Sequence, residues 1–196
     1  MNLKNLFSLK KKVESKKAID TTRTMPLKLP ADKVKIGWVS PVYNQSRSVK
    51  LDSNTLAKNR LVAMIPESPE IDFYKVLRTR IMQRIREHGG KSIMITSALP
   101  GEGKTVTAIN LAMAFAKEYE QTVLLVDGDL RMQQIHKILG YESNKGLLDY
   151  LLADCSVSDL IIWPNIEKLT VISGGRTIKE SSEILTSPRM GNSWKT

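Results

Sequence analysis

The chain has 196 residues, 41% of them hydrophobic, and a formal net charge of +10. This length accommodates one ordinary domain with an extension, and the apolar share suffices for a core. No stretch reaches the roughly 18 apolar residues of a membrane-spanning helix, and the N-terminus lacks the apolar segment of a secretory signal. Cys155 is the single cysteine, which excludes an intrachain disulfide and fits a reducing cytoplasm.

The positive charge is confined to the first third of the chain. Residues 1–60 carry 14 Lys/Arg and 4 Asp/Glu, whereas residues 61–196 carry 16 of each. A neutral folded part argues against a nucleic-acid-binding core, which would carry the basic surface itself. Residues 1–17 alternate leucines with lysines, as in a basic amphipathic helix that contacts an anionic membrane surface. A solvated basic tail is the alternative, because a short helix is marginal on its own.

Residues 1–67 are interpreted as a basic arm and linker with short ordered pieces, since prolines are scattered through polar stretches. The predicted folded domain occupies residues 68–196. Ser68-Pro69-Glu70 predicts a helix start with Ser68 as the N-cap. Apolar residues from Ile71 to Ile85 then recur at helical spacing, and Gly89-Gly90 predicts the helix end.

Strands and helices alternate after this first helix. The apolar runs predict strands at Ser92–Thr96, Thr122–Val126 and Leu169–Ser173, and helical segments at Thr105–Lys117, Met132–Leu139 and Gly146–Leu152. The strands are continuously apolar rather than alternating, which is typical of a parallel sheet covered by helices on both faces. The predicted fold is therefore α/β, a parallel sheet with helices on both faces and a basic N-terminal extension; the loop described next makes it a P-loop NTPase-type sheet.

A glycine-containing loop, Ser97–Thr105, joins the first predicted strand to its helix. Strand, Gly-x-Gly-Lys-Thr and helix form a phosphate-binding loop, in which backbone N–H groups and the helix N-terminus receive a triphosphate. Lys104 would reach the outer phosphates, and the Thr105 hydroxyl would hold Mg²⁺. Ala98 stands where the strict motif has glycine, and a chance match in a surface turn is the alternative. The predicted nucleotide-binding residues are Pro100, Gly101, Glu102, Gly103, Lys104, Thr105 and Val106.

Two carboxylates, Asp127 and Asp129, follow the second predicted strand. Ligands of open α/β sheets bind at this carboxyl end of the strands. Asp127 is predicted to accept a proton from an attacking hydroxyl or to orient a water, and Asp129 to position Mg²⁺. Lys104, Asp127 and Asp129 are thus the candidate catalytic residues, and Thr105 and both aspartates the candidate metal ligands. An Asp-rich turn that only caps the next helix is the alternative.

The two motifs together resemble those of the bacterial tyrosine kinases, in particular the tyrosine autokinases of exopolysaccharide and exosortase loci. Further matching landmarks are Gly146–Leu152, Leu169–Gly175 and Glu183–Met190, so that the resemblance covers about residues 48–190. It implies an ATP- and Mg²⁺-dependent protein-tyrosine autokinase that regulates exopolysaccharide polymerisation and export. It also implies a cytoplasmic location at the inner face of the plasma membrane, beside a membrane chain-length regulator (co-polymerase) whose cytoplasmic tail activates the kinase.

The resemblance further implies a homo-oligomer formed through the helix at residues 70–88. The family carries an acid-x-x-Arg-x-x-Arg pattern there, and this chain has Asp72, Lys75 and Arg78. Lysine in place of the first arginine keeps the charge but loses a forked contact. A solvated, charged helix face is the alternative interpretation.

Two departures from the family pattern leave other functions open. The family has a third motif, an apolar strand ending in Asp, downstream of Ser187–Arg189, and this chain ends at Thr196 without one, which predicts a sheet incomplete at its C-terminal side. The five tyrosines form no cluster; they are Tyr43, Tyr74, Tyr119, Tyr141 and Tyr150. The alternatives are a partition- or division-site-type ATPase switch, which normally has an early Lys-Gly-Gly where this chain has Ala98–Pro100, and an inactive nucleotide-binding fragment.

Overall fold

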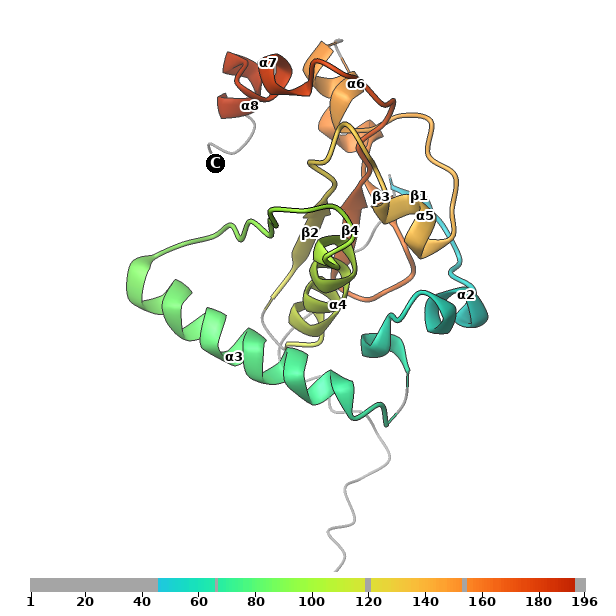
Figure 1. Cartoon of the computed structure of the whole chain (residues 1–196), viewed down its shortest axis with the longest axis vertical. Helices are drawn as coiled ribbons and strands as arrows, with labels where there is room; N and C mark the ends of the chain where they lie inside the picture. Colours follow the sequence, from blue (N-terminus) through green and yellow to red (C-terminus); the bar gives the residue numbers. More distant parts are fainter. Residues whose placement is uncertain (1–45, 66, 119–120, 153–154, 193–196) are drawn as a thin grey trace, which may run out of the picture. The chain divides into compact units, whose positions relative to one another are not determined.

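The computed structural model of the chain describes residues 46–65, 67–118, 121–152 and 155–192. The basic segment 1–17 lies outside these residues. In chain order the elements are β1 (Arg47–Ser48), α2 (Ser53–Lys58), η1 (Val62–Met64), α3 (Glu70–His88), α4 (Lys104–Ala116), β2 (Val123–Val126), α5 (Ile135–Leu139), α6 (Leu147–Leu152), η2 (Val157–Asp159), β3 (Ile162–Trp163), β4 (Leu169–Ile172), α7 (Ser181–Leu185) and α8 (Pro188–Asn192) (Figure 1).

The four strands form one sheet in the order β1-β3-β4-β2. β2 runs parallel to β4, with Val123 opposite Leu169 and Val126 opposite Ile172. β1 and β3 are also parallel, but β3 and β4 pair antiparallel through Ile162 and Val171. The predicted α/β P-loop-type fold is confirmed, although the sheet is mixed and not wholly parallel. Only the short stretch 164–168 joins β3 to β4, too short for the crossover that a parallel pair requires.

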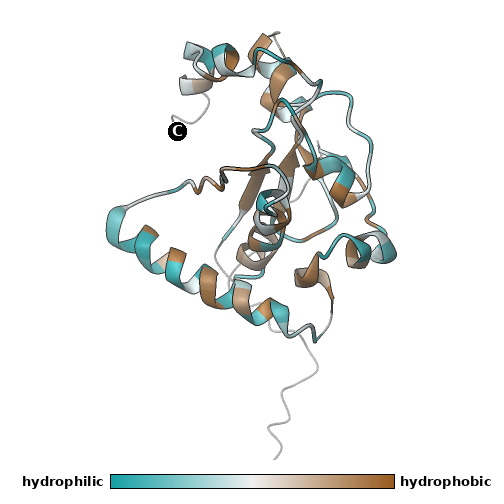
Figure 2. Ribbon diagram, viewed as in Figure 1, coloured by the Kyte–Doolittle hydropathy of each residue, from teal (hydrophilic) through white to brown (hydrophobic). Residues whose placement is uncertain are grey.

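Two apolar cores lie on opposite faces of the sheet. Side chains of a strand alternate between faces: Leu125 and Val171 belong to the core that includes Ile109 and Met113 of α4. Val126 and Ile172 belong to the other core, which is built with the leucines of α6. The strands are accordingly brown in Figure 2. Helices therefore cover both faces, as the continuous apolar strands predicted.

The predicted strand at Ser92–Thr96 is not formed. This segment runs as an irregular stretch between α3 and α4 (Figure 1), and the side chains of Ile93 and Met94 are 44% and 86% exposed. A strand is stabilised by a hydrogen-bonded neighbour and by burial of its side chains. Among the described residues, β2 pairs only with β4, and no strand is placed to pair with residues 92–96.

Helix α3 confirms its prediction almost residue for residue and ends at Gly89, whose φ of 72° is left-handed. Its predicted N-cap is wrong: Pro69 occupies that position, and the Ser68 hydroxyl donates to the Glu70 carboxylate instead. Within the stretch interpreted as a linker, α2 and η1 place Leu56, Leu61 and Ala63 in the core beside α4. These pieces help to hold the helix that begins at the phosphate-binding loop.

Candidate nucleotide and phosphoryl-transfer site

The loop Ser97–Thr105, called the P-loop from here on, turns through two glycines into α4. Gly101 and Gly103 have φ values of 82° and 85°, a left-handed conformation that costs other residues roughly 1–2 kcal/mol. Nothing lies within 4 Å of a Cβ built on either glycine, so the backbone angle and not space requires glycine. Gly103 is the N-cap, which places Lys104 and Thr105 in the first turn of α4, where anions are favoured.

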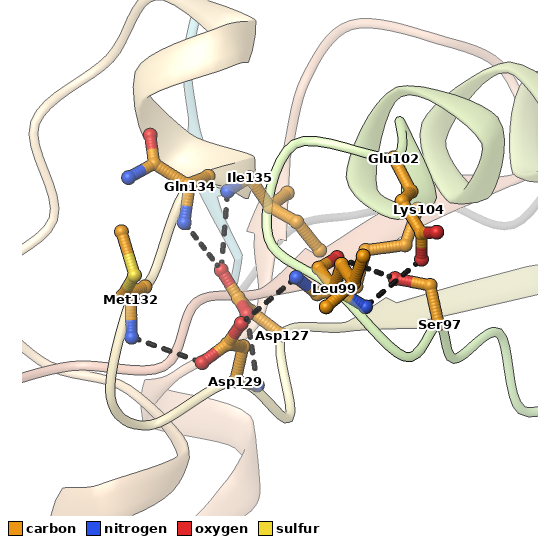
Figure 3. A network of polar contacts seen from close by, with 9 residues as sticks. All are labelled: Ser97, Leu99, Glu102, Lys104, Asp127, Asp129, Met132, Gln134 and Ile135. Carbon is orange, nitrogen blue, oxygen red and sulfur yellow. Dashed lines mark hydrogen bonds and ion pairs between the residues drawn. The ribbon is translucent and has the colours of Figure 1, made fainter.

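Side chains of the P-loop brace its own backbone (Figure 3). The Leu99 N–H donates to Glu102 Oε2 at 3.0 Å, and the Ser97 hydroxyl donates to the Leu99 carbonyl at 3.2 Å. Pro100 lies between these contacts and fixes its own φ. Of the predicted nucleotide-binding residues, Lys104, Thr105 and Val106 are half-buried at the start of α4, and Glu102 is exposed.

Residues 127–134, called the Asp loop from here on, begin where β2 ends. The Asp127 N–H still donates to the Ile172 carbonyl of β4 at 2.9 Å, so that the sheet fixes the position of Asp127. Its carboxylate is buried, with 4% exposure. Oδ1 accepts from the Asp129 N–H at 3.2 Å, and Oδ2 accepts from Gln134 and Ile135 N–H groups at 3.1 Å each. Burial raises the pKa of Asp127, and these backbone hydrogen bonds oppose the rise.

Asp129 lies at the more open end of this arrangement. Its Oδ1 accepts from the Met132 N–H at 2.9 Å, and its Oδ2 lies 3.5 Å from Lys104 Nζ, with both side chains 32% exposed. The structure thereby brings together the three predicted catalytic residues, which come from two segments more than 20 positions apart (Figure 3). A cation and a carboxylate that meet at a helix N-terminus can bind a phosphate together with its metal.

The donor set of this site fits Mg²⁺. Among the described residues there is no cluster of three or more His, Cys, Asp or Glu that could enclose a metal by itself. Mg²⁺ in nucleotide sites needs only one or two protein oxygen ligands, because phosphates and waters complete its shell. The Thr105 hydroxyl and the Asp129 carboxylate supply such oxygens, and Asp127, whose two oxygens accept three N–H groups, has less capacity for a metal.

The structure gives one residue of the α3 pattern a different contact from the expected one. Arg78 is turned toward α4, where Nη1 donates to the Ala114 carbonyl at 2.9 Å and Nη2 pairs with the Glu118 carboxylate. Asp72 and Lys75 form an ion pair of 2.7 Å with each other on the surface. Arg78 therefore fastens α3 to the C-terminal end of α4 within this chain.

Sequence reasoning missed the residues that support the Asp loop from the far side. Gln133 is 3% exposed, and its Nε2 donates to the Arg176 carbonyl at 2.7 Å, across 43 positions. The Gly174-Gly175 pair after β4 was the available signal, because glycines at a strand end mark close backbone approaches. Gly174 leaves room for Gln133, since a Cβ there would lie 2.6 Å from its side chain.

The sequence between residues 90 and 192 matches the family described as the AAA domain, over more than half of the chain. The chain belongs to the AAA domain family. Its P-loop and Asp loop both lie inside the matched region, and no helix of the described residues is long and apolar enough to cross a membrane.

Among known proteins, this AAA domain chain is similar to tyrosine kinases of bacteria. It is 34% identical to the tyrosine-protein kinase YwqD of Bacillus subtilis over 146 residues, which are 74% of this chain and 59% of YwqD. The chimerical protein CapA2B2 superposes with a TM-score of 0.59 at 32% identity, and the kinase domain of the Escherichia coli tyrosine kinase ETK with 0.63 at 25%. Both matches cover 78% of this chain and 63% of the solved one. The resemblance that the motifs indicated is thus confirmed, with the chain spanning about three-fifths of these relatives.

Proposed function

We propose that this chain is the nucleotide-binding and catalytic part of an ATP- and Mg²⁺-dependent protein-tyrosine kinase. The observation that carries the proposal is the contact between Lys104 of the P-loop and Asp129 of the Asp loop, at 3.5 Å. It joins a phosphate-binding helix start to a carboxylate pair in a chain whose relatives are named tyrosine-protein kinases. By its resemblance to the autokinases of exopolysaccharide loci, the kinase phosphorylates itself and regulates polysaccharide polymerisation and export.

Each residue of the site has a proposed role in phosphoryl transfer. Backbone N–H groups of Gly101–Thr105 receive the phosphates, and Lys104 neutralises charge on the transferred group. Thr105 and Asp129 would hold Mg²⁺, and the bound ion would supply neutralisation of phosphate charge. A tyrosyl oxygen bonds to the γ-phosphorus as the bond to the bridging oxygen breaks, and ADP leaves. Asp127 accepts the phenolic proton: its Oδ1 accepts one N–H only, which leaves a lone pair for the proton.

The proposed partners follow from the resemblance and from the surface of α3. The activating partner is the cytoplasmic tail of a membrane chain-length regulator, which places the kinase at the inner face of the membrane. Self-association through α3 is supported by its exposed apolar side chains, with Phe73 75% and Val76 54% exposed. Hydrophobic and hydrophilic residues alternate along this helix in Figure 2. Monomeric proteins rarely expose clustered apolar side chains, and such a cluster commonly marks a protein–protein interface.

The test is phosphotyrosine detection by mass spectrometry after incubation with ATP and Mg²⁺. Lys104→Met is expected to lose phosphotyrosine about 100-fold or more, because one charge-stabilising donor typically contributes that much. Lys91→Met, which removes an exposed lysine ahead of the P-loop, is the matched control and should label as the wild type does. Labelling that persists in Lys104→Met contradicts the proposal, and ATP hydrolysis without any self-labelling favours the ATPase switch.

A further inference from the structure

The segment that follows β4, residues 173–178, is fastened on two sides. The Ile178 N–H donates to the Leu130 carbonyl of the Asp loop at 3.0 Å. The Leu147 and Leu148 N–H groups at the start of α6 donate to the Ser173 and Gly174 carbonyls at 2.7 and 3.0 Å. Lys104 therefore meets the Asp loop at Asp129, and this segment meets it at Leu130 and at Gln133.

Close backbone contacts fix the position of Arg176 in this segment. The buried Gln133 amide donates to the Arg176 carbonyl at 2.7 Å. A Cβ on Gly146 would lie 2.0 Å from the Ser173 carbonyl, and one on Gly175 would lie 2.6 Å from Asp149 Oδ2. Only glycine permits these close approaches. The main chain at Arg176 is therefore closely packed and held in one position.

The side chain of Arg176, in contrast, extends into solvent. It is 71% exposed, and its Nε lies 3.6 Å from Asp149 Oδ1. Asp149 already uses Oδ2 to accept from the Gly146 N–H at 2.8 Å. Within the described part of the chain, the structure gives the guanidinium no further partner. An exposed ion pair of this kind contributes little stability, so the guanidinium is available to a carboxylate or phosphate that matches its fork.

Two more exposed cations flank Arg176. Arg131 follows Leu130, and Lys179 follows Ile178. The hydrogen bond described above joins Ile178 to Leu130, the two residues that precede these cations. Acidic residues close to these cations are Asp149, which is paired with Arg176, Asp129, which is paired with Lys104, and the exposed Glu180. Nucleotide phosphates are expected beside Lys104, which pairs with Asp129, and the hydrogen bond to the adjacent Leu130 holds the segment of Arg176 next to this site.

We propose that Arg176, with Arg131 and Lys179, binds acidic residues next to the acceptor tyrosine. This inference rests on the proposed kinase function and adds its substrate class: tyrosines within acidic polypeptide segments. Arg176 acts on the polypeptide substrate and not on the nucleotide. Its main chain is held beside the Asp loop by Gln133, so that its exposed guanidinium is presented to an acidic residue near the acceptor tyrosine.

The test is equilibrium binding of two fluorescein-labelled peptides to the full chain by anisotropy, one with glutamates and one with glutamines around a single tyrosine. Arg176→Gln is expected to weaken binding of the glutamate peptide about tenfold, because one charge-assisted contact is lost. Arg86→Gln, an exposed arginine of α3, is the matched control and should change it less than twofold. Asp149→Asn frees the guanidinium and should leave glutamate-peptide binding equal or tighter.

Nucleotide binding, measured in parallel with a fluorescent ATP analogue, separates this inference from the proposed function. Arg176→Gln should bind the analogue as the wild type does, and Lys104→Met should not bind it. The inference is overturned if the wild type fails to prefer the glutamate peptide, if Arg176→Gln matches Arg86→Gln, or if Arg176→Gln loses the analogue as well. Retention of the analogue by Lys104→Met would instead contradict the proposed function and leave the peptide result standing.

Discussion

At the scale of single residues, the two carboxylates of the Asp loop differ in what surrounds their oxygens. Asp127 is buried and accepts three backbone N–H groups, whereas Asp129 is partly exposed and accepts one. A carboxylate that pairs three buried donors holds the loop in shape. The Asp127 carboxylate accepts from the Asp129 N–H at the start of the Asp loop. The position of Asp129 relative to Lys104 therefore depends on Asp127.

Substitution by asparagine is expected to lower the free energy of unfolding more at Asp127 than at Asp129. In Asp127→Asn an amide NH₂ must face a backbone N–H, which should lower the free energy of unfolding by about 1–3 kcal/mol. Asp129→Asn keeps an oxygen for the Met132 N–H and should change the free energy of unfolding by less than about 0.5 kcal/mol. Urea denaturation followed by circular dichroism measures both values. Equal effects of the two substitutions would refute the distinction.

His136 makes the stability of the fold depend on pH. Burial lowers the pKa of its imidazole below the ordinary value of 6.5, and the buried Nδ1 atom has no hydrogen-bond partner among the described residues. The unfolded chain therefore binds a proton at a higher pH than the folded chain does. The free energy of unfolding should fall as pH drops through 6.5 toward the folded pKa, and be fully retained above 6.5.

The measurement is urea denaturation of wild type and His136→Gln between about pH 7 and pH 5, where the linkage operates. The variant should show a flatter pH dependence, since glutamine does not titrate. His88→Gln, at an exposed position near the end of α3, should retain the wild-type slope. An unchanged slope in His136→Gln would show that another group causes the dependence.

At the scale of the elements, α3 is attached by the charged contacts of Arg78 and by the packing of Ile71 against the core. None of its 19 residues is buried, so apolar packing alone contributes little to holding it. Arg78 bonds to a carbonyl in the last turn of α4 and to Glu118, where the helix dipole favours a cation.

Arg78→Met keeps most of the aliphatic side chain and removes the charged contacts. It is expected to lower the free energy of unfolding by about 1–2 kcal/mol and to speed hydrogen exchange in α3 relative to α4. Arg80→Met, exposed on the same helix, is the control and should have little effect. If both variants exchange alike, Arg78 does not attach the helix.

The helices and strands also show which features of the fold can be predicted from the sequence. α3, α4, β2 and β4 were predicted to within about two residues, because their apolar patterns and glycine stops are local signals. β1 and β3 have two residues each, too few to show a period. Residues 92–96 carry the apolar run of a strand, but strand formation depends on a neighbour that periodicity does not report. Likewise the P-loop and the Asp pair are contiguous motifs, whereas the Gln133–Arg176 contact exists only in the folded chain.

At the scale of the whole described chain, Asn110 of α4 joins the stretch before α3 to the P-loop helix. It is fully buried. Its Oδ1 accepts from the Ala63 N–H at 3.0 Å, and its Nδ2 donates to the Arg60 and Val106 carbonyls at 3.0 and 3.1 Å. One side chain thus pairs the Ala63 N–H and the Arg60 carbonyl of the stretch before α3 with α4, in the low-dielectric core where unpaired groups cost most.

Asn110→Leu keeps the number of side-chain heavy atoms and leaves the Ala63 N–H and the Arg60 carbonyl without partners. We expect the free energy of unfolding to fall by about 2–4 kcal/mol, since each orphaned buried group costs about 1–3 kcal/mol. Asn144→Leu, at an exposed position, should change it by less than about 0.5 kcal/mol. Hydrogen exchange locates the effect: residues 56–64 should lose protection before β2 and β4 do. If protection falls uniformly instead, the stretch 46–65 unfolds together with the sheet, and Asn110 contributes to the core as a whole.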